Sequence, residues 1–301
     1  MVIVLGEILI DVFPDDRRIG GAPFNFAFHL KQMGVPVRFI TRVGDDADGR
    51  QILARLRSAG FETTDVQIDP HHPSGTVRVE LDGDGVPRFT ICENVAYDHL
   101  DLTAAATADR QAPQMIYFGS LVQRTDGGHR QVRGFLDACG KSAVRFCDIN
   151  LRPPHINPDA LVDALHRADL LKLSGDELAD IAQRLGGPPD EKDSIDWLMD
   201  AYAIRSLALT RGARGSTFVG SEGTLHQPAA PTPSVADTVG AGDGFAAVLA
   251  VGMLRRLPLR TTLHQASRFA ARICSINGAV PDGAAFYAEV RAAMKGDADG
   301  R

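Results

Sequence analysis

Cysteine is scarce in this chain. Its 301 residues include four cysteines, Cys92, Cys139, Cys147 and Cys274, and these are widely separated. They form no Cys-x-x-Cys pair, and no histidine stands beside them at metal-ligand spacing. The pattern argues against a disulfide scaffold and against a zinc site built on cysteine. We expect reduced, mostly buried thiols in a cytosolic protein.

Long apolar runs and basic clusters are also missing. No run approaches the roughly 18 residues needed to cross a bilayer. The apolar start of the chain is interrupted by Glu7 and Asp11 and has no basic leader, which is typical of a buried strand rather than a signal peptide. The net charge of −6 is spread along the chain, and the basic residues Arg255 and Arg256 form no more than a short pair. We therefore predict a cytoplasmic protein that binds neither membrane nor nucleic acid.

What the chain does have is a repeated alternation of short β-rich apolar runs and helical patterns. With 44% hydrophobic content, 301 residues could bury one large core or two ordinary ones, but no linker of domain length divides them. The alternation predicts an α/β fold, a doubly wound, mostly parallel sheet with helices on both faces. The expected strands are 2–9, 37–43, 115–118, 143–148, 170–173 and 206–209, and the expected helices include 22–33 and 49–59.

Residues 75–95 break this rhythm, because apolar and polar side chains alternate there with a period of two. Two such runs flank an Asp-Gly-Asp-Gly turn at 82–85, which predicts a hairpin with one solvent-exposed face. An ordinary edge hairpin explains the pattern. A lid that folds over a ligand explains it equally well, because strands outside the main sheet must cover something.

A glycine-rich turn opens a helical pattern after residue 240. Gly240 and Gly242 lack Cβ atoms, so backbone N–H groups can converge on an anion at the positive end of the helix dipole. Asp243 follows in the first turn, where a carboxylate beside an anion could accept a proton from a hydroxyl. From these residues alone, a tight turn with a stabilising N-terminal acid is the better explanation.

Residues 237–243, Asp-Thr-Val-Gly-Ala-Gly-Asp, resemble the Asp-Thr-x-Gly-Ala-Gly-Asp motif of the ribokinase-like sugar kinases, the phosphofructokinase-B-type family. The resemblance implies that Asp243 is the catalytic base and that the N–H groups at Gly240, Ala241 and Gly242 form an anion hole. It also implies a single ribokinase-like α/β domain over residues 1–301. A small β-lid, formed by residues 12–19 and 75–97, would be inserted within this domain.

A second motif near the amino terminus fits the same family. Residues 20–25, Gly-Gly-Ala-Pro-Phe-Asn, resemble the family's first motif, in which a Gly-Gly turn opens a helix. By this resemblance Asp11, Gly20, Gly21 and Asn25 bind sugar hydroxyls, which suits carboxylate and amide groups. Without the motif, Asp11 would be a strand-end turn residue and Asn25 a polar residue on a helix face.

Three further segments resemble the nucleotide-binding half of the family. Residues 210–215 look like its Thr-x-Gly-x-x-Gly loop, and 172–177 its Asn-x-x-Glu element with Ser in place of Asn. Residues 270–281 match the helix and turn beside the adenine. The implied cofactor-binding residues are Ser174, Glu177, Thr210, Gly212, Gly215 and Asn277. ATP and Mg²⁺ are the implied cofactors, with Glu177 reaching Mg²⁺ through water, and Asp237 and the Val239 carbonyl would hold a monovalent cation such as K⁺.

These patterns together predict an ATP-dependent kinase for a small sugar. The Gly-Gly-Ala-Pro motif and the Asn-Leu-Arg-Pro run at 150–153 look most like fructokinases, so fructose is the expected acceptor. Ribose, 2-keto-3-deoxygluconate and a nucleoside stay open. In the related kinases the Asn and Arg that match Asn150 and Arg152 face the site. The Arg152 guanidinium could form a bidentate hydrogen-bonded pair with a carboxylate or phosphate; a surface ion pair is the alternative.

Two other classes of function are weighed against the kinase. A sugar- or nucleotide-binding protein without catalysis could use the same fold. A dinucleotide-dependent oxidoreductase is disfavoured, because Gly6 stands alone after the first strand. Family members often dimerise through their lids, and an apolar outer face on Val77, Val79 and Leu81 would permit a homodimer here.

Overall fold

The computed structural model describes residues 1–301 except 82–86, 104–111, 141, 233, 282 and 296–301. Its largest element is a nine-stranded sheet in the order β13-β12-β11-β10-β9-β8-β1-β4-β5. All neighbouring pairs are parallel except β11 with β12 and β12 with β13. The strands are β1 (Val2–Leu5), β4 (Val37–Gly44), β5 (Val66–Asp69), β8 (Met115–Phe118), β9 (Val144–Asp148), β10 (Leu170–Ser174), β11 (Ser206–Thr210), β12 (Ser216–Gly220) and β13 (Gly223–Gln227).

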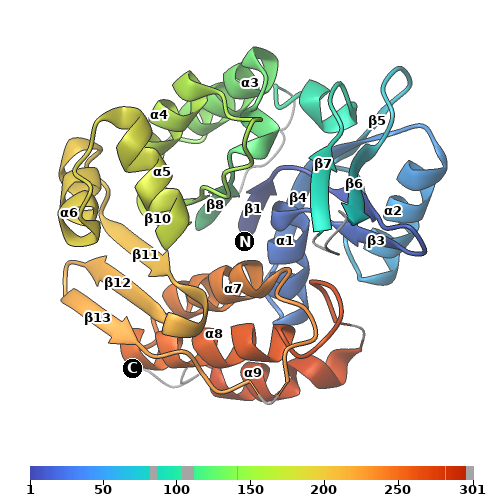
Figure 1. The fold of residues 1–301 in the computed structure, drawn as a ribbon. Coiled ribbons are helices and arrows are strands. Elements are labelled where there is room, and N and C mark those ends of the chain that lie inside the picture. The colour runs from blue at the N-terminus through green and yellow to red at the C-terminus, as the bar shows by residue number, and fades with distance from the viewer. Residues whose placement is uncertain (82–86, 104–111, 141, 233, 282, 296–301) are drawn as a thin grey trace.

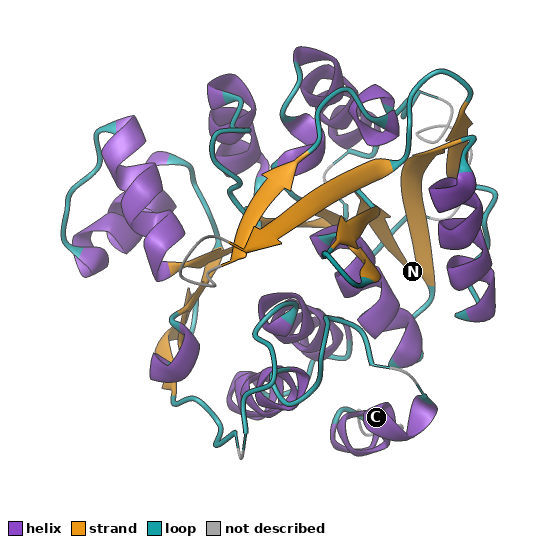
Figure 2. Ribbon diagram, turned by 45° about the vertical axis from the view of Figure 1, so that its right-hand side comes forward, coloured by secondary structure: helices purple, strands orange, loops and turns teal. Residues whose placement is uncertain are grey.

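Helices cover both faces of this sheet (Figures 1 and 2). The helices are α1 (Ala22–Gln32), α2 (Ala47–Ser58), α3 (Asp126–Ala138), α4 (Pro158–Arg167), α5 (Gly175–Leu185), α6 (Glu191–Ala201), α7 (Ala241–Leu254), α8 (Leu259–Ile273) and α9 (Ala288–Ala293), with short 3-10 turns η1 (Ala96–His99), η2 (Leu121–Gln123), η3 (Gly212–Arg214) and η4 (Ala284–Tyr287). The predicted doubly wound, mostly parallel sheet is confirmed.

The two faces of the sheet belong to two separate hydrophobic cores. In β1, Val2 and Val4 join the core beneath α1, α7 and α8, whereas Ile3 and Leu5 join the core beneath α3 to α6. All four side chains are buried, because successive residues of a strand point to opposite faces and both faces are covered. This explains why the central strands read as unbroken apolar runs.

A second, four-stranded sheet stands beside the first, in the order β3-β2-β6-β7. Its strands are β2 (Leu9–Val12), β3 (Arg17–Gly20), β6 (Gly75–Leu81) and β7 (Pro87–Ile91). The predicted strand pair in 75–95 is present as β6 and β7, paired antiparallel; its expected turn at 82–85 lies outside the described residues. Whether this sheet acts as a lid stays a prediction.

The single strand expected over residues 2–9 is wrong. The chain leaves the large sheet after Leu5 and enters the small sheet at Leu9. Gly6 makes the change of direction with φ of +149°, and a Cβ on it would lie 2.3 Å from Cγ of Pro23. Periodicity could not reveal this break, because the apolar residues before it, in the large sheet, and after it, leading into the small sheet, are equally buried.

The expected apolar outer face on the hairpin is also wrong. Val77 and Val79 are only 6% and 3% exposed, and Val77 packs with Leu9 and Tyr97. The exposed residue between them is Arg78, because side chains alternate across a strand. The side chain of Leu81 lies outside the described part. Val77 and Val79 therefore do not form the exposed apolar surface through which a homodimer was expected.

Within the described residues, no helix is both long and apolar enough to span a membrane.

Candidate functional site

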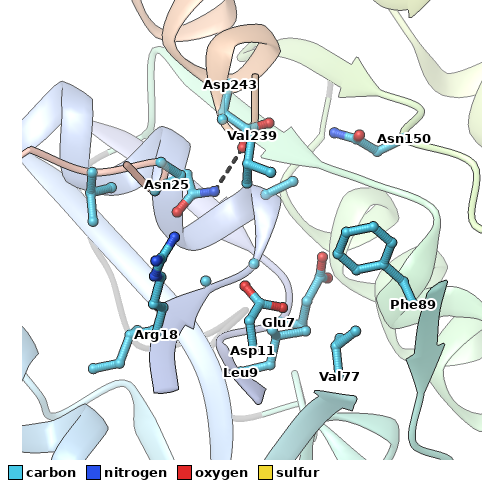
Figure 3. A pocket seen from close by; sticks show the side chains of 18 of the residues that line it. Glu7, Leu9, Asp11, Arg18, Asn25, Val77, Phe89, Asn150, Val239 and Asp243 are labelled. Carbon is cyan, nitrogen blue, oxygen red and sulfur yellow. Dashed lines mark hydrogen bonds between the residues drawn. The ribbon is translucent and has the colours of Figure 1, made fainter. Parts of the chain in front are cut away.

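A cavity of about 840 Å³ opens between the two sheets. Its walls come from β2, β3 and β7 of the small sheet, the start of α1, the start of α7, and the segments that follow β1 and β9. It therefore lies at the carboxyl ends of the large sheet's strands, where α/β sheets bind their ligands. Figure 3 shows side chains of the small sheet, among them Asp11 and Phe89, on the opposite side of it from Asp243 of α7.

The amino terminus of α7 forms one wall of this cavity. Gly240 caps the helix in the left-handed region, with φ of +77°, and a Cβ on it would lie 2.3 Å from Cβ of Ala279. The lack of a side chain matters less at Gly242 than at Gly240, since the nearest atom to a Cβ there would be the Lys172 Nζ at 3.4 Å. The first N–H groups of a helix have no partner within it and carry the positive end of its dipole. This wall can therefore bind an anion.

Asp243 is the third residue of α7, and its side chain is buried beside this anion site. The Asn25 Nδ2 of α1 donates a hydrogen bond of 2.8 Å to its Oδ2 (Figure 3). Burial raises the pKa of Asp243, and the positive charge of Lys172 and the hydrogen bond from Asn25 oppose that rise. Two residues that lie 218 positions apart in the chain are thus joined at one carboxylate.

Lys172 of β10 is a buried cation that the sequence analysis did not assign to the site. Its Nζ donates a 2.7 Å hydrogen bond to Oδ1 of Asp148, whose other oxygen accepts one of 3.1 Å from the Tyr117 hydroxyl. Burial lowers the pKa of Lys172, but Asp148, Glu177 and Asp243 together hold it above its usual value. A lysine inside the apolar run Leu-Leu-Lys-Leu was the available signal, because buried lysines are rare unless paired.

The residues predicted to bind the sugar face α7 across the cavity. Gly21 caps α1 with φ of +111°, and a Cβ on Gly20 would lie 2.4 Å from Oδ2 of Asp11. Burial raises the pKa of Asp11 to about 6, and Arg152 and Arg18 oppose the shift. The structure therefore brings Asp11, Gly20, Gly21, Asn25 and Asp243 to a single cavity.

Three buried polar atoms that face this cavity have no hydrogen-bond partner in the described part of the chain. They are the Glu7 Oε2, the Asn25 Oδ1 and the Asn150 Nδ2, two acceptors and a donor. Buried polar groups in proteins are nearly always paired, so a ligand that both donates and accepts hydrogen bonds fits here. Asn150 was expected at the site, with Arg152, from the resemblance, whereas Glu7 was not assigned to the site from the sequence.

Arg152 lines the same cavity but is held by its own loop. Its guanidinium donates to the Asn150 Oδ1 at 3.0 Å and to the Leu151 carbonyl at 3.1 Å. No carboxylate is paired with it at salt-bridge distance in the described residues. The charge of Arg152 instead lowers the pKa values of the surrounding acids, Glu7, Asp11 and Asp243.

The predicted cofactor residues divide into two groups. Asn277 lines the cavity, whereas Ser174, Glu177, Thr210, Gly212 and Gly215 do not. Ser174 and Thr210 are register partners at the carboxyl ends of β10 and β11, on the same edge of the sheet as the cavity.

Ser174 and Glu177 have clear structural duties in α5. The Ser174 hydroxyl accepts from the Glu177 N–H at 3.2 Å, and the Ser174 N–H donates to Oε2 of Glu177 at 2.7 Å, which is a capping box. The Glu177 Oε1 accepts a 2.7 Å hydrogen bond from the Leu151 N–H and thereby fixes the loop that carries Arg152.

The predicted metal-binding residues form no cluster of several carboxylates. Asp237 accepts hydrogen bonds from the N–H groups of Val239 at 3.0 Å and of Gly278 at 3.1 Å. Among the described residues, no group of three or more His, Cys, Asp or Glu could hold a metal ion. Mg²⁺ usually keeps several waters and binds few protein carboxylates. It therefore fits this site as an ion that is bound mainly by the phosphate oxygens of a nucleotide.

The chain matches the model of the pfkB family carbohydrate kinases over residues 2–282. It is 32% identical over 262 residues to a fructokinase of Klebsiella pneumoniae, a match that covers 83% of each chain. Among solved structures it resembles a sugar kinase of Pyrococcus horikoshii in complex with ATP, with a TM-score of 0.76, 24% identity, and coverage of 93% of this chain and 94% of the other. It also resembles a Burkholderia thailandensis nucleoside kinase in complex with inosine, with a TM-score of 0.80, 20% identity, and coverage of 98% and 94%.

Proposed function

Because this chain belongs to the pfkB family of carbohydrate kinases, which are phosphotransferases with an alcohol group as acceptor, we propose that it transfers the γ-phosphoryl group of ATP to a hydroxyl of a small sugar. The observation that carries the proposal is Asp243, buried at the amino terminus of α7 and hydrogen-bonded to Asn25 of the acceptor half. Fructose is the first candidate acceptor, since a fructokinase is among the relatives.

In this proposal the residues act by position and charge. Asp243 accepts the proton of the attacking hydroxyl, while the N–H groups of residues 240–243 hold the oxygens of the transferred phosphoryl group. Asp11, Asn25 and the Gly20-Gly21 turn hold the sugar so that the hydroxyl faces Asp243. Phosphoryl transfer needs little covalent chemistry from the protein, so positioning supplies most of the rate.

The ions and the nucleotide would lie on the α7 side of the cavity. Mg²⁺ would neutralise charge on the phosphates of ATP. Glu177, whose two oxygens each accept a backbone N–H group, would reach it through water. Asn277 would lie near the base, and the loop at 210–215 would lie beyond it. We keep Asp237 and the Val239 carbonyl as the site for a monovalent cation such as K⁺.

A panel of acceptors in a coupled ADP-release assay tests the proposal. Fructose, ribose, 2-keto-3-deoxygluconate and inosine would each be offered with ATP and Mg²⁺, and we expect fructose to give the largest kcat/KM. Inosine is included because a nucleoside kinase shares the fold. If inosine stimulates ADP release and none of the sugars does, the acceptor is a nucleoside rather than a sugar. Binding of a sugar without any acceptor-dependent ADP release would instead support a non-catalytic binding protein.

The small sheet makes a second prediction, which concerns water. Phe89 of β7 lines the cavity although the residue is 56% exposed (Figure 3). Its ring is therefore placed to pack over a bound sugar and shield it from water. We expect Phe89→Ser to raise the ratio of ATP hydrolysis to sugar phosphorylation several-fold, because water then reaches the phosphoryl group. Ile68→Ser, at an equally apolar surface position that is 46% exposed and outside the cavity, is the control. An unchanged ratio in Phe89→Ser would count against a lid.

A further inference from the structure

Glu7 is a buried acid at the point where the chain crosses from the large sheet to the small one. It follows Gly6 and lies between β1 and β2. Its backbone has little freedom, because a Cβ on Gly21 would lie 2.8 Å from the Glu7 carbonyl oxygen. The start of α1 therefore fixes the place from which this side chain extends.

The carboxyl group of Glu7 faces the cavity with one oxygen unused. The residue is 5% exposed, and its Oε2 has no hydrogen-bond partner among the described residues. It lines the large cavity and also the small cavity beside Ser120 and Asp148. In Figure 3 Glu7 and Asp11 lie on the opposite side of the cavity from Asp243.

A buried acid with an unpaired oxygen lowers the stability of the folded protein. A buried carboxyl oxygen that has lost water and gained no partner retains its desolvation penalty, and the penalty is largest when the group is charged. Burial raises the pKa of Glu7 to about 7; a backbone hydrogen bond at Glu7 and the charge of Arg152 oppose the shift, Asp243 adds to it, and Arg124 opposes it. Tyr97 and Tyr117 also interact electrostatically with Glu7, and Asp148 lines the same small cavity as Glu7.

We propose that Glu7 accepts a hydrogen bond from a hydroxyl of the acceptor and is, with Asp11, a specificity-determining residue of the cavity. This rests on the proposed function, because it assumes that the cavity takes a polyhydroxylated acceptor. A site built around a buried acceptor rejects an analogue that lacks the matching hydroxyl, since the buried group would then remain unpaired. Ionised Glu7 accepts this bond more strongly than neutral Glu7.

Glu7→Gln tests the inference, because it keeps the size of the side chain and removes its charge. With the best acceptor of the panel, we expect KM for the acceptor to rise about tenfold while KM for ATP stays within about twofold of the wild-type value. Wild-type kcat/KM for the acceptor should rise with pH through about 7, where Glu7 ionises. In Glu7→Gln this component should disappear, and the rise due to Asp243 should remain. Asp163→Asn, in a distant ion-paired cluster with Arg167, is the matched carboxyl-to-amide control.

Calorimetric titration of the acceptor without nucleotide supplies a readout that does not depend on turnover. We expect tighter binding at pH 8 than at pH 6 for the wild type and no such difference for Glu7→Gln. If the active wild type and Glu7→Gln share the same acceptor KM and pH profile, the inference is overturned and the kinase proposal stands. If the wild type turns over no acceptor and binds none, the proposed function and the inference both fall.

A double variant separates direct contact from an effect through Arg152. If Glu7 only positions Arg152, then Glu7→Gln combined with Arg152→Gln will weaken acceptor binding no more than Arg152→Gln alone. That outcome would overturn the direct contact. If Glu7 binds the acceptor itself, the two losses will combine to a larger one.

Discussion

Asp243→Asn is expected to lower kcat by about 10²–10⁴-fold, the range that removal of a general base produces. The amide keeps the shape of the side chain and can still accept the hydrogen bond from the Asn25 Nδ2, so acceptor and ATP should bind nearly as before. A loss in kcat with little change in binding is the mark of an interaction made only in the transition state. Single-turnover phosphorylation together with calorimetric binding of the acceptor measures both.

The pH profile sharpens this test. In the proposed mechanism the ionised form of Asp243 is the active one, and burial raises its pKa, so the wild-type rate should fall as the pH falls through that raised value. The residual rate of Asp243→Asn should lack this fall. Asp193→Asn is the matched control, because Asp193 is also the third residue of its helix, α6, but is exposed and lies outside the cavity. Near-normal turnover in Asp243→Asn would remove it as the base.

Lys172→Met is expected to lower both stability and activity. The substitution leaves Asp148 fully buried with the Tyr117 hydroxyl as its remaining side-chain partner. Breaking a buried ion pair from one side costs about 3–5 kcal/mol of unfolding free energy. Without the ammonium, the pKa of Asp243 should rise further, so the pH at which the rate falls should move upward.

The loss of stability in Lys172→Met should depend on pH. Burial raises the pKa of Asp148 from 3.8 to about 6. Between these values the unfolded chain ionises first, so ionisation of Asp148 favours unfolding and stability falls as pH rises. Removing Lys172 raises the pKa of Asp148 further, so the difference in unfolding free energy between variant and wild type should be larger at pH 8 than at pH 5.

Chemical denaturation at both pH values measures this difference. Lys192→Met, at an exposed position in the first turn of α6, controls for the loss of a lysine. An equal loss of stability at pH 5 and pH 8 would show that the charge of Lys172 is not what stabilises Asp148.

The sheet could be predicted from the sequence because the parallel strands carry their signal locally. Strands buried on both faces give apolar runs such as Met-Ile-Tyr-Phe at 115–118, and the structure has β8 at those bounds. The crossing at Gly6 carries no such signal, since Leu5 and Ile8 on either side are equally apolar and equally buried. The direction of the hairpin's apolar face could not be predicted either. Alternation shows that two faces differ, but not which one the rest of the molecule covers.

The candidate site was predicted only where a motif names residues. Asp11, Asn25 and Asp243 were assigned on motifs, and the structure brings them to one cavity; their roles stay predictions. No motif assigns a role to Glu7 or Lys172. Their meaning depends on what surrounds them in space, because a charged residue in an apolar run signals burial but not the identity of its partner.

The crossing at Gly6 also bears on the order of events during turnover. Asp11 belongs to the small sheet, whereas Asp243 is carried by α7, which packs on the large sheet. A hinge between the two sheets would therefore carry the acceptor toward its base, with residues 6–8 as one of its pivots. Binding of the acceptor would then bring the two sheets together. In an enzyme that holds ATP without acceptor, Asp11 and Asp243 would stay apart and the catalytic site would not be assembled. Ordered use of the two substrates would follow from a single change of direction in the chain.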